Sequence, residues 1–375
     1  MTVFTGDFYP DQVGGQGIYA YEVATRAAAL GLEVSVVCLA AAGRMAHRYP
    51  DGLSVRFIQA RSNVIGYAAA LERVRNEAVA NADVVHVNEL YGFTASLFRS
   101  RKRGLVVSSH NSYLDRFHAA RGLKKLIYPP LLALERLSYP CADRLIIGSE
   151  IERAPARSLG VDNEKIRLIP YGVDAERFSD PAGIQRRRTR ARLGLPETAR
   201  VALFVGRFVE RKKPHVVARA FRELCAEDPN FHGLLIGDGA MMPAVREVIG
   251  NEPRIVTLGA VPFDELHEYY AAADVFTLPS VGEGSISLVV LEAAAAGLPL
   301  VLTEDSCGQS AVFEAGKNGE LVVLDSAQDL ANGLRAALAR RQEYGLRSRA
   351  LVEAHFSWDA CARQTVDCYR EVARR

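Results

Sequence analysis

The strongest constraint on the fold is a repeated alternation between short apolar segments rich in β-branched residues and longer segments with helical periodicity. Val34–Leu39 is an apolar segment of this kind, typical of a strand buried on both faces of a sheet. It follows a helical pattern from Ile18 to Leu30, which Gly31 ends. Strands that alternate with helices in this way predict βαβ units and a parallel sheet.

The alternation occurs twice along the 375 residues. In the first run we expect strands at 2–5, 34–39, 53–58, 83–87, 105–110 and 144–148, and helices at 18–30, 67–80 and 123–139. In the second run we expect strands at 201–205, 233–236, 255–258, 275–278 and 300–302, and helices at 186–193, 216–224, 266–273 and 288–296. The segment 170–181 is rich in Pro, Gly and Asp and separates the two runs. Two doubly wound domains that face a central cleft are therefore predicted, with ligands at the carboxyl ends of the strands.

The composition excludes several classes of protein. Hydrophobic residues make up 49% and charged residues 24%, which is ordinary for a soluble globular protein and excludes a disordered chain. The net charge is only +2, so we expect no binding of nucleic acid over the whole surface.

The sequence also predicts where the protein resides. No apolar stretch reaches the roughly 18 residues that a spanning helix needs, and Asp7, Pro10 and Asp11 interrupt any secretory signal. The six cysteines form no CxxC pair, and no His cluster has zinc-ligand spacing. We therefore expect a cytoplasmic protein with reduced thiols.

The residues with candidate chemistry follow the predicted strands. Arg207 and Lys212 come after the strand 201–205, where cations suit a phosphate or diphosphate. The alternative is a solvated basic loop. We expect the basic run from Arg186 to Arg192 to be solvated as well, since it lies near the link between the domains.

A glycine-rich loop precedes the first predicted helix. Gly14, Gly15 and Gly17 let the backbone approach a ligand closely, and the amino end of the following helix favours an anion. The spacing is neither that of a P-loop nor that of GxGxxG. The alternative is a plain turn between strand and helix.

Two acids and one histidine complete the candidate set. Glu283 and Glu292 flank a Gly/Ser loop, and Glu292 lies within an otherwise apolar helix. An acid there is costly unless it accepts hydrogen bonds, which ribose hydroxyls could donate; the alternative is an internal capping or backbone bond. His110 ends a buried strand, and its alternative role is packing.

Together these motifs resemble the retaining GT-B glycosyltransferases of glycosyltransferase family 4 (glycosyl transferases group 1), over nearly the whole chain. Pro170–Asp174 is similar to the family's link between domains, and Pro279-Ser280 followed by Glu283 is similar to its donor loop. Phe356-Ser357-Trp358 resembles the start of its last helix, which crosses back to the N-terminal domain. The implied domains are an acceptor-side domain at 1–174, a nucleotide-sugar-binding domain at 175–354 and a returning helix at 355–375.

The resemblance implies a hexosyltransferase-type enzyme that uses a nucleotide-diphosphate sugar as donor, without a cofactor. The residues that it places in the catalytic centre are Arg207, Lys212, His110 and Glu283. Those that it places around the donor are Gly14, Gly15, Ser287, Leu288 and Glu292. Within these sets Arg207 and Lys212 would hold the diphosphate, and Glu292 the ribose.

One departure from the family concerns the two acids. Glu283 and Glu292 lie one position further apart than the acids in the family's usual loop. Either the loop carries one extra residue and Glu283 still reaches the donor sugar, or the first acid is lost. We favour the extra residue.

The implied mechanism is front-face transfer with retention, in which the leaving diphosphate takes the acceptor's proton. No Asp-x-Asp motif follows a strand, so we expect no metal. The alternative function is a nucleotide-sugar epimerase with the same twin-domain fold. A nicotinamide-dependent oxidoreductase is disfavoured, because neither domain opens with strand–GxGxxG–helix.

The acceptor is expected on the N-terminal domain. A glycan, a lipid-linked compound or a small molecule fits this reading, in the biosynthesis of a polysaccharide, a glycolipid or a glycosylated metabolite. Residues 116–128 mix basic and apolar side chains, which suits peripheral contact with the inner face of an anionic membrane. The alternative is a solvated helix with one packed face.

Overall fold

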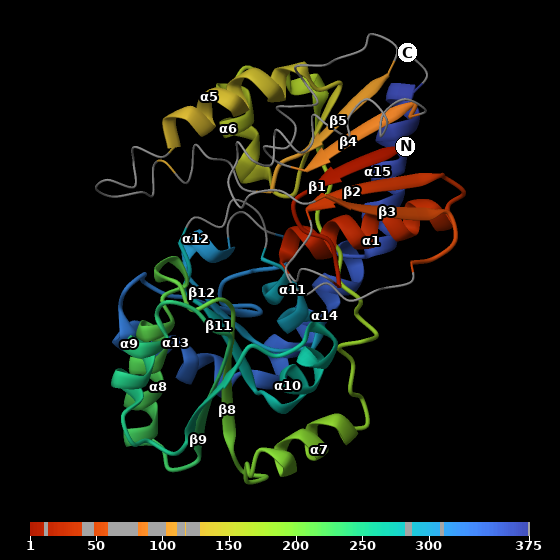
Figure 1. Ribbon diagram of the computed structural model, residues 1–375. Coiled ribbons are helices and arrows are strands. Elements are labelled where there is room, and N and C mark those ends of the chain that lie inside the picture. Colours follow the sequence, from red (N-terminus) through yellow and green to blue (C-terminus); the bar gives the residue numbers. More distant parts are fainter. Residues whose placement is uncertain are drawn as a thin grey trace. The chain divides into compact units, whose positions relative to one another are not determined.

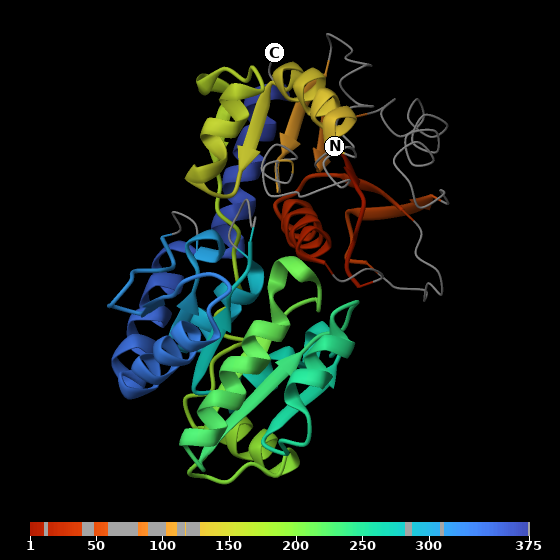
Figure 2. The ribbon, with the colours of Figure 1, turned by 90° about the vertical axis from the view of Figure 1, so that its left-hand side faces the viewer.

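The computed structural model describes residues 1–10, 14–39, 49–58, 82–88, 103–110, 117, 128–281, 287–307 and 311–373. The chain divides into two compact units (Figures 1 and 2). The N-terminal unit comprises Met1–Tyr171 together with Trp358–Arg375, and the C-terminal unit comprises Gly172–Ser357. The predicted domain boundaries, after residues 174 and 354, lie within a few residues of these.

The described part of the N-terminal unit contains a seven-stranded parallel sheet in the order β3-β2-β1-β4-β5-β6-β7. Its strands are β1 (Thr2–Thr5), β2 (Val34–Leu39), β3 (Leu53–Ile58), β4 (Val84–Asn88), β5 (Gly104–Ser108), β6 (Arg144–Ile147) and β7 (Ile166–Leu168). Its helices include α1 (Gly15–Ala29), α5 (Tyr128–Ser138), α6 (Arg153–Ser158) and α15 (Trp358–Ala373). The chain proceeds outward from β1 to β3 and then returns to the other side of β1 for β4. The topological switch point therefore lies between β1 and β4.

The last helix, α15, packs against α1, β4 and β5 (Figure 1). A glycine on β5 permits this approach, because a Cβ on Gly104 would lie 2.3 Å from Val372 Cγ2. The end of the chain thus becomes part of the N-terminal unit, as the final segment's resemblance implied.

The C-terminal unit contains a parallel sheet in the order β10-β9-β8-β11-β12-β13 among its described residues. Its strands are β8 (Arg200–Val205), β9 (Phe231–Ile236), β10 (Ile255–Gly259), β11 (Val275–Leu278), β12 (Leu300–Leu302) and β13 (Gly319–Leu321). Its helices include α7 (Ile184–Arg192), α8 (Pro214–Glu227), α9 (Met242–Ile249), α10 (Leu266–Ala272), α11 (Leu288–Ala295), α12 (Glu304–Cys307), α13 (Ala327–Ala339) and α14 (Arg341–His355). Here the switch point lies between β8 and β11.

Burial explains why most of the strands could be predicted from the sequence. Val36 on β2, Val107 on β5 and Leu203 on β8 are fully enclosed, as the β-branched and apolar runs predicted. The short strands β7 and β13 carry no such run and were not predicted, nor were helices α13 and α14. The predicted helix at 67–80 lies outside the described residues.

The basic helix α7 is not simply solvated, contrary to the prediction. Arg190 is only 5% exposed, and its guanidinium lies 2.6 Å from the buried carboxylate of Asp274. Arg186 and Arg341 reach the same carboxylate at 2.5 and 2.8 Å. Asp274 also accepts a hydrogen bond from the Val201 N–H at 2.8 Å. The carboxylate sits at the start of a buried strand, so it is stable there only with cations around it.

Candidate functional site

The loop after β8 is held by close backbone packing against the loop after β9. A Cβ on Gly237 (φ +137°) would lie 1.9 Å from the Gly206 carbonyl oxygen, and one on Gly239 (φ +151°) 2.5 Å from the Phe208 carbonyl oxygen. The Phe208 N–H donates to the Asp238 carbonyl at 2.8 Å. Only glycine permits this approach, so the Gly-Asp-Gly segment fixes the path of the chain on both sides of Arg207.

Two cations in this loop differ in their surroundings. The Arg207 side chain is exposed and makes no hydrogen bond or ion pair within the described residues. Lys212 is buried at the end of a short 3-10 turn, Glu210–Lys212, that leads into α8. The next residue, Lys213, pairs with Glu210 at 3.2 Å and Asp325 at 2.9 Å. Arg207 can therefore offer positive charge to an anion, while Lys213 is already neutralised.

The loops after β8 and β11 are joined across the switch point. The Val281 N–H donates to the Arg211 carbonyl at 2.8 Å. Residues 282–286 follow, so Glu283 and the extra loop residue predicted there lie outside the described residues. The next described residues are Ser287, the N-cap of α11, and Leu288, its first residue, and neither of their N–H groups donates a hydrogen bond within the described part of the chain. These amides can bind an anion at the amino end of the helix.

Glu292 is buried in α11, as the apolar pattern around it predicted. Its Oε2 accepts a hydrogen bond from the Tyr270 hydroxyl at 2.8 Å, and no group in the described residues donates to its Oε1. Burial raises the pKa of Glu292 to about 7, although the Tyr270 bond and the charge of Arg177 act in the opposite direction. An internal hydrogen bond thus exists, but it comes from the Tyr270 side chain and not from the capping or backbone group considered in the sequence analysis, and it engages one of the two oxygens.

His110 lies just beyond the end of β5 in the N-terminal unit and is 2% exposed. Its Nδ1 shares a hydrogen bond with the Tyr171 hydroxyl, and the Tyr19 ring meets it edge-on at 4.7 Å. Burial, reinforced by nearby His86, lowers the pKa of His110 to about 3. The imidazole is therefore neutral near pH 7, so it can position a group by hydrogen bonding but cannot act as a cation.

A buried polar network supports this region and was missed by sequence reasoning. His86 on β4 bonds to the Tyr369 hydroxyl on α15 at 2.6 Å through Nδ1 and to Ser108 Oγ at 2.7 Å through Nε2. Ser108 Oγ in turn lies 3.1 Å from the Tyr19 hydroxyl on α1. No sequence signal links these residues, because His86 and Tyr369 are 283 positions apart.

The glycine loop is described from Gly14 onward. Helix α1 begins at Gly15, and the extended residue Gly14 precedes it and accepts the Ile18 N–H at 3.0 Å. A Cβ on Gly14 would come 3.1 Å from Asp7 Oδ2, so the position favours glycine. Gly14, Gly15 and His110 thus all follow carboxyl ends of strands in the N-terminal unit. Their roles, like those of the residues in the C-terminal unit, stay predictions.

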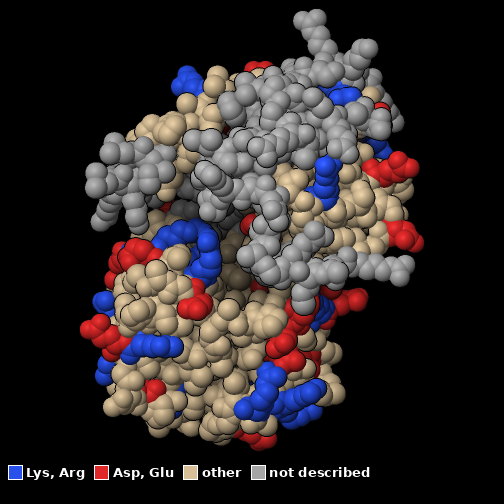
Figure 3. All heavy atoms as spheres, viewed as in Figure 1, with Lys and Arg blue, Asp and Glu red and all other residues tan. Residues whose placement is uncertain are grey.

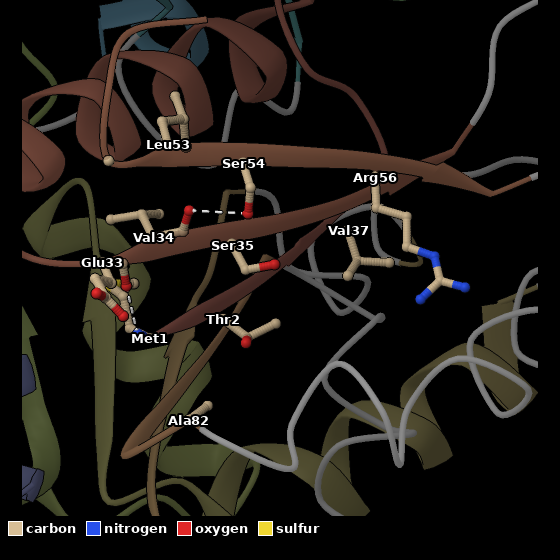
Figure 4. Close-up of a pocket in the computed structure, with 11 residues that line it drawn as sticks. Met1, Thr2, Glu33, Val34, Ser35, Val37, Leu53, Ser54, Arg56 and Ala82 are labelled. Carbon is tan, nitrogen blue, oxygen red and sulfur yellow. Dashed lines mark hydrogen bonds between the residues drawn. The ribbon is translucent and has the colours of Figure 1, made fainter.

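A hollow of about 580 Å³ lies elsewhere on the N-terminal unit (Figure 4). It is lined by residues at the amino ends of strands, among them Thr2, Val34 and Leu53, and contains none of the predicted site residues. Ligands of open α/β sheets bind at the opposite, carboxyl ends. We therefore place the candidate site at the carboxyl ends and not in this hollow.

On the face drawn in Figure 3, Lys and Arg side chains are interspersed with Asp and Glu side chains. None of the helices in the described ranges is long and apolar enough to cross a membrane. The segment 116–128, for which membrane contact was predicted, lies outside the described residues except for 117 and 128.

Comparison with solved structures identifies the fold. A sucrose-phosphate synthase from Thermosynechococcus elongatus superposes with a TM-score of 0.85 at 23% identity, covering 99% of this chain and 98% of the other. HepE of Anabaena, solved in complex with UDP-glucose, superposes with a TM-score of 0.78 at 19% identity, covering 99% and 100%. Two parallel-sheet Rossmann-like domains of this kind are the GT-B fold of glycosyltransferases, and the predicted fold class is confirmed.

Comparison of sequences defines the family. Residues 13–177 match the family described as Glycosyltransferase Family 4, and residues 199–340 match Glycosyl transferases group 1. The chain is 31% identical to a D-inositol 3-phosphate glycosyltransferase of Nocardioides sp., covering 98% of this chain and 86% of the relative. It is 30% identical to one of Kineococcus radiotolerans, covering 99% and 92%. The chain belongs to glycosyltransferase family 4 and is a glycosyltransferase of the group 1 type, which confirms the predicted family.

Proposed function

We propose that this glycosyltransferase moves a hexose from a nucleotide-diphosphate sugar to a hydroxyl group of an acceptor, with retention of configuration. One observation carries the proposal. Arg207 and Lys212 follow β8, and the buried Glu292 lies in the helix that follows β11, so a set suited to diphosphate and ribose flanks one switch point. HepE of Anabaena, which shares the fold, has been solved with UDP and with UDP-glucose, and this supports a nucleotide-sugar donor.

The C-terminal unit would stabilise the leaving group. Breaking the bond between sugar and diphosphate builds negative charge on the diphosphate. Arg207 can bind that charge with a planar fork of donors and Lys212 with a compact ammonium group. The amides of Ser287 and Leu288 add helix-end dipoles that are oriented before the reaction begins. Because two cations already neutralise the diphosphate, we propose that turnover needs neither a metal ion nor a cofactor.

Glu292 would bind the ribose. Its Oε2 is engaged by Tyr270, and ribose hydroxyls can donate to the carboxylate as the tyrosine does. In the proposed assignment Glu283 contacts hydroxyls of the donor sugar, and the backbone of Gly14 and Gly15 approaches the donor from the glycine loop.

The acceptor's proton would pass to the leaving diphosphate. The acceptor hydroxyl attacks the anomeric carbon on the face from which the diphosphate departs. The C–O bond to the diphosphate breaks with its electron pair, and a diphosphate oxygen takes the proton from the acceptor. His110 is neutral, so its role is to orient a hydroxyl group beside the donor sugar.

We propose a polyhydroxylated acceptor on the N-terminal unit. The relatives named above act on D-inositol 3-phosphate, which makes that compound the first acceptor to try. The products would belong to a polysaccharide, a glycolipid or a glycosylated metabolite made in the cytoplasm. Contact of segment 116–128 with a membrane surface is part of the proposal.

The test is a panel of UDP-, GDP- and ADP-sugars, with and without D-inositol 3-phosphate, with nucleoside diphosphate release as the measurement. We expect slow hydrolysis of one donor alone, faster release with acceptor, and a product of unchanged anomeric configuration by NMR. Activity should survive excess EDTA. A changed sugar without acceptor would instead indicate an epimerase, and an inverted product would refute retention.

A further inference from the structure

Asn88 is a buried amide at the carboxyl end of a central strand in the N-terminal unit. It is the last residue of β4 and is 1% exposed. It lies opposite Ser108 in the register between β4 and β5, and β1 flanks β4 on the other side. Asn88 therefore stands beside the switch point between β1 and β4, the place where open α/β sheets bind ligands.

Neither polar atom of this amide has a hydrogen-bond partner among the residues that the structure describes. Both Nδ2 and Oδ1 are enclosed and make no hydrogen bond within the described part of the chain. Exchanging the two atoms by rotating the amide would not change this result. Most buried polar side chains in proteins are paired, because an unpaired donor or acceptor lowers stability.

Another buried asparagine in this chain shows the usual arrangement. Asn318 is fully buried in the C-terminal unit. Its Oδ1 accepts the Glu314 N–H at 2.7 Å, and its Nδ2 donates to the Val312 carbonyl at 2.7 Å and to Ser348 Oγ at 3.3 Å. Asn318 is thus a structural residue, whereas Asn88 is equally buried and makes no such hydrogen bonds within the described ranges.

The neighbours of Asn88 on its own sheet face are already engaged. His86, two residues earlier on the strand and so on the same face, uses both ring nitrogens, with Tyr369 and Ser108. Ser108 Oγ, opposite Asn88, also contacts the Tyr19 hydroxyl. The polar groups nearest along β4 and β5 therefore serve the buried network, and the amide is left for a molecule that enters the site.

We propose that the side-chain amide of Asn88 binds hydroxyl groups of a substrate sugar or cyclitol. An amide offers one donor group and one acceptor atom side by side, and a pair of hydroxyls can satisfy both. A phosphate could accept a hydrogen bond from the amide N–H group, but the amide oxygen would repel the phosphate oxygens. A neutral polyol therefore matches the site better. The inference rests on the proposed function, which supplies two such polyols: the transferred sugar and the acceptor.

The first part of the test measures stability. Asn88→Leu replaces the amide by an apolar side chain of similar size and removes the unpaired groups. We expect it to melt at the wild-type temperature or about 2–4 °C higher. Asn318→Leu, the matched control, should melt well below wild type because it removes the three hydrogen bonds of the Asn318 amide. If the melting temperature of Asn88→Leu falls as far as that of Asn318→Leu, Asn88 is a structural residue and the proposal is overturned.

The second part measures turnover, with UDP-glucose as donor probe and D-inositol 3-phosphate as acceptor probe. We expect Asn88→Leu to lose about tenfold or more in kcat/KM. A loss in donor hydrolysis without acceptor assigns the amide to the transferred sugar, and a loss only in transfer assigns it to the acceptor. If Asn88→Leu changes neither kcat/KM for transfer nor the rate of donor hydrolysis, the inference is overturned. If the wild-type protein turns over neither probe, it is the proposed function that has failed for them, and the melting comparison still decides whether Asn88 is structural.

Discussion

Replacing Glu292 by glutamine should stabilise the protein at alkaline pH while weakening its binding of nucleotide. Burial raises the pKa of this carboxyl from its ordinary value of 4.5 to about 7. Glutamine keeps the size of the side chain, and its Oε1 can still accept the hydrogen bond from Tyr270. The substitution therefore removes the titratable proton and little else.

The size and sign of the stability effect follow from the two pKa values. Below pH 4.5 Glu292 is protonated in both the folded and the unfolded chain, so it carries no penalty. Between the two values the unfolded chain loses the proton first, so the free energy of unfolding falls as pH rises. Above pH 7 both states are ionised and the penalty is complete, at about 3 kcal/mol for the shift of pKa. Glu292→Gln should therefore be more stable than wild type by that amount at pH 8.5, roughly 6–12 °C in melting temperature, and similar to it at pH 4.5.

Nucleotide binding should show the opposite pH dependence. Ribose hydroxyls donate to the ionised carboxylate better than to the neutral acid, so binding favours loss of the proton. In the wild-type protein the affinity for UDP should rise as pH increases through about 7, with a proton released on binding below that pH. In Glu292→Gln the affinity should be lower by about 1–3 kcal/mol, and the part of its pH dependence that the carboxyl causes should be absent.

Calorimetry of UDP binding in two buffers of different ionisation enthalpy, together with melting curves from pH 5 to 9, measures both effects. Glu343→Gln is the matched control. The carboxylate of Glu343 is exposed, and the hydrogen bond from Arg340 lowers its pKa. Replacing Glu343 should therefore leave the pH dependence of the melting temperature above pH 5 unchanged. Lower stability of Glu292→Gln at every pH, with unchanged UDP affinity, would refute the reasoning and make Glu292 purely structural.

Three further predictions concern charge. Lys212→Ala should lower kcat roughly a hundredfold in a folded protein, whereas the neighbouring, already ion-paired Lys213→Ala should change it little; equal rates in the two variants would remove Lys212 from the mechanism. Asp274→Asn should lower the free energy of unfolding by about 3–5 kcal/mol in a denaturant titration, because three guanidinium groups lose their buried carboxylate. Asp264 is exposed, so Asp264→Asn should lower the free energy of unfolding far less. A similar loss of stability in both variants would argue against the buried cluster. Turnover at saturating donor should be unchanged by excess EDTA, and activity restored only by added Mg²⁺ or Mn²⁺ would contradict the assignment of diphosphate charge to Arg207 and Lys212.

The candidate site was predictable wherever its residues lie next to a strand in the sequence. A parallel sheet brings the carboxyl ends of its strands to one edge, so Arg207 after β8 and His110 after β5 could be selected from position alone. Glu292 was identifiable because an acid among apolar residues in a helix needs a hydrogen-bond donor. The donor of that hydrogen bond, Tyr270, could not be predicted, since Tyr270 and Glu292 lie on different helices.

The sequence by itself determined the two-domain α/β architecture and the family, because local apolar runs and ordered motifs depend only on neighbours along the chain. The tertiary structure alone decided which side chains share a buried environment. It joined Tyr369 to His86, gathered arginines from α7 and α14 around Asp274, and left Asn88 without a hydrogen-bond partner among the described residues. Burial and hydrogen bonding depend on distances in space between residues far apart in sequence, and these also set the pKa of Glu292 and keep His110 neutral.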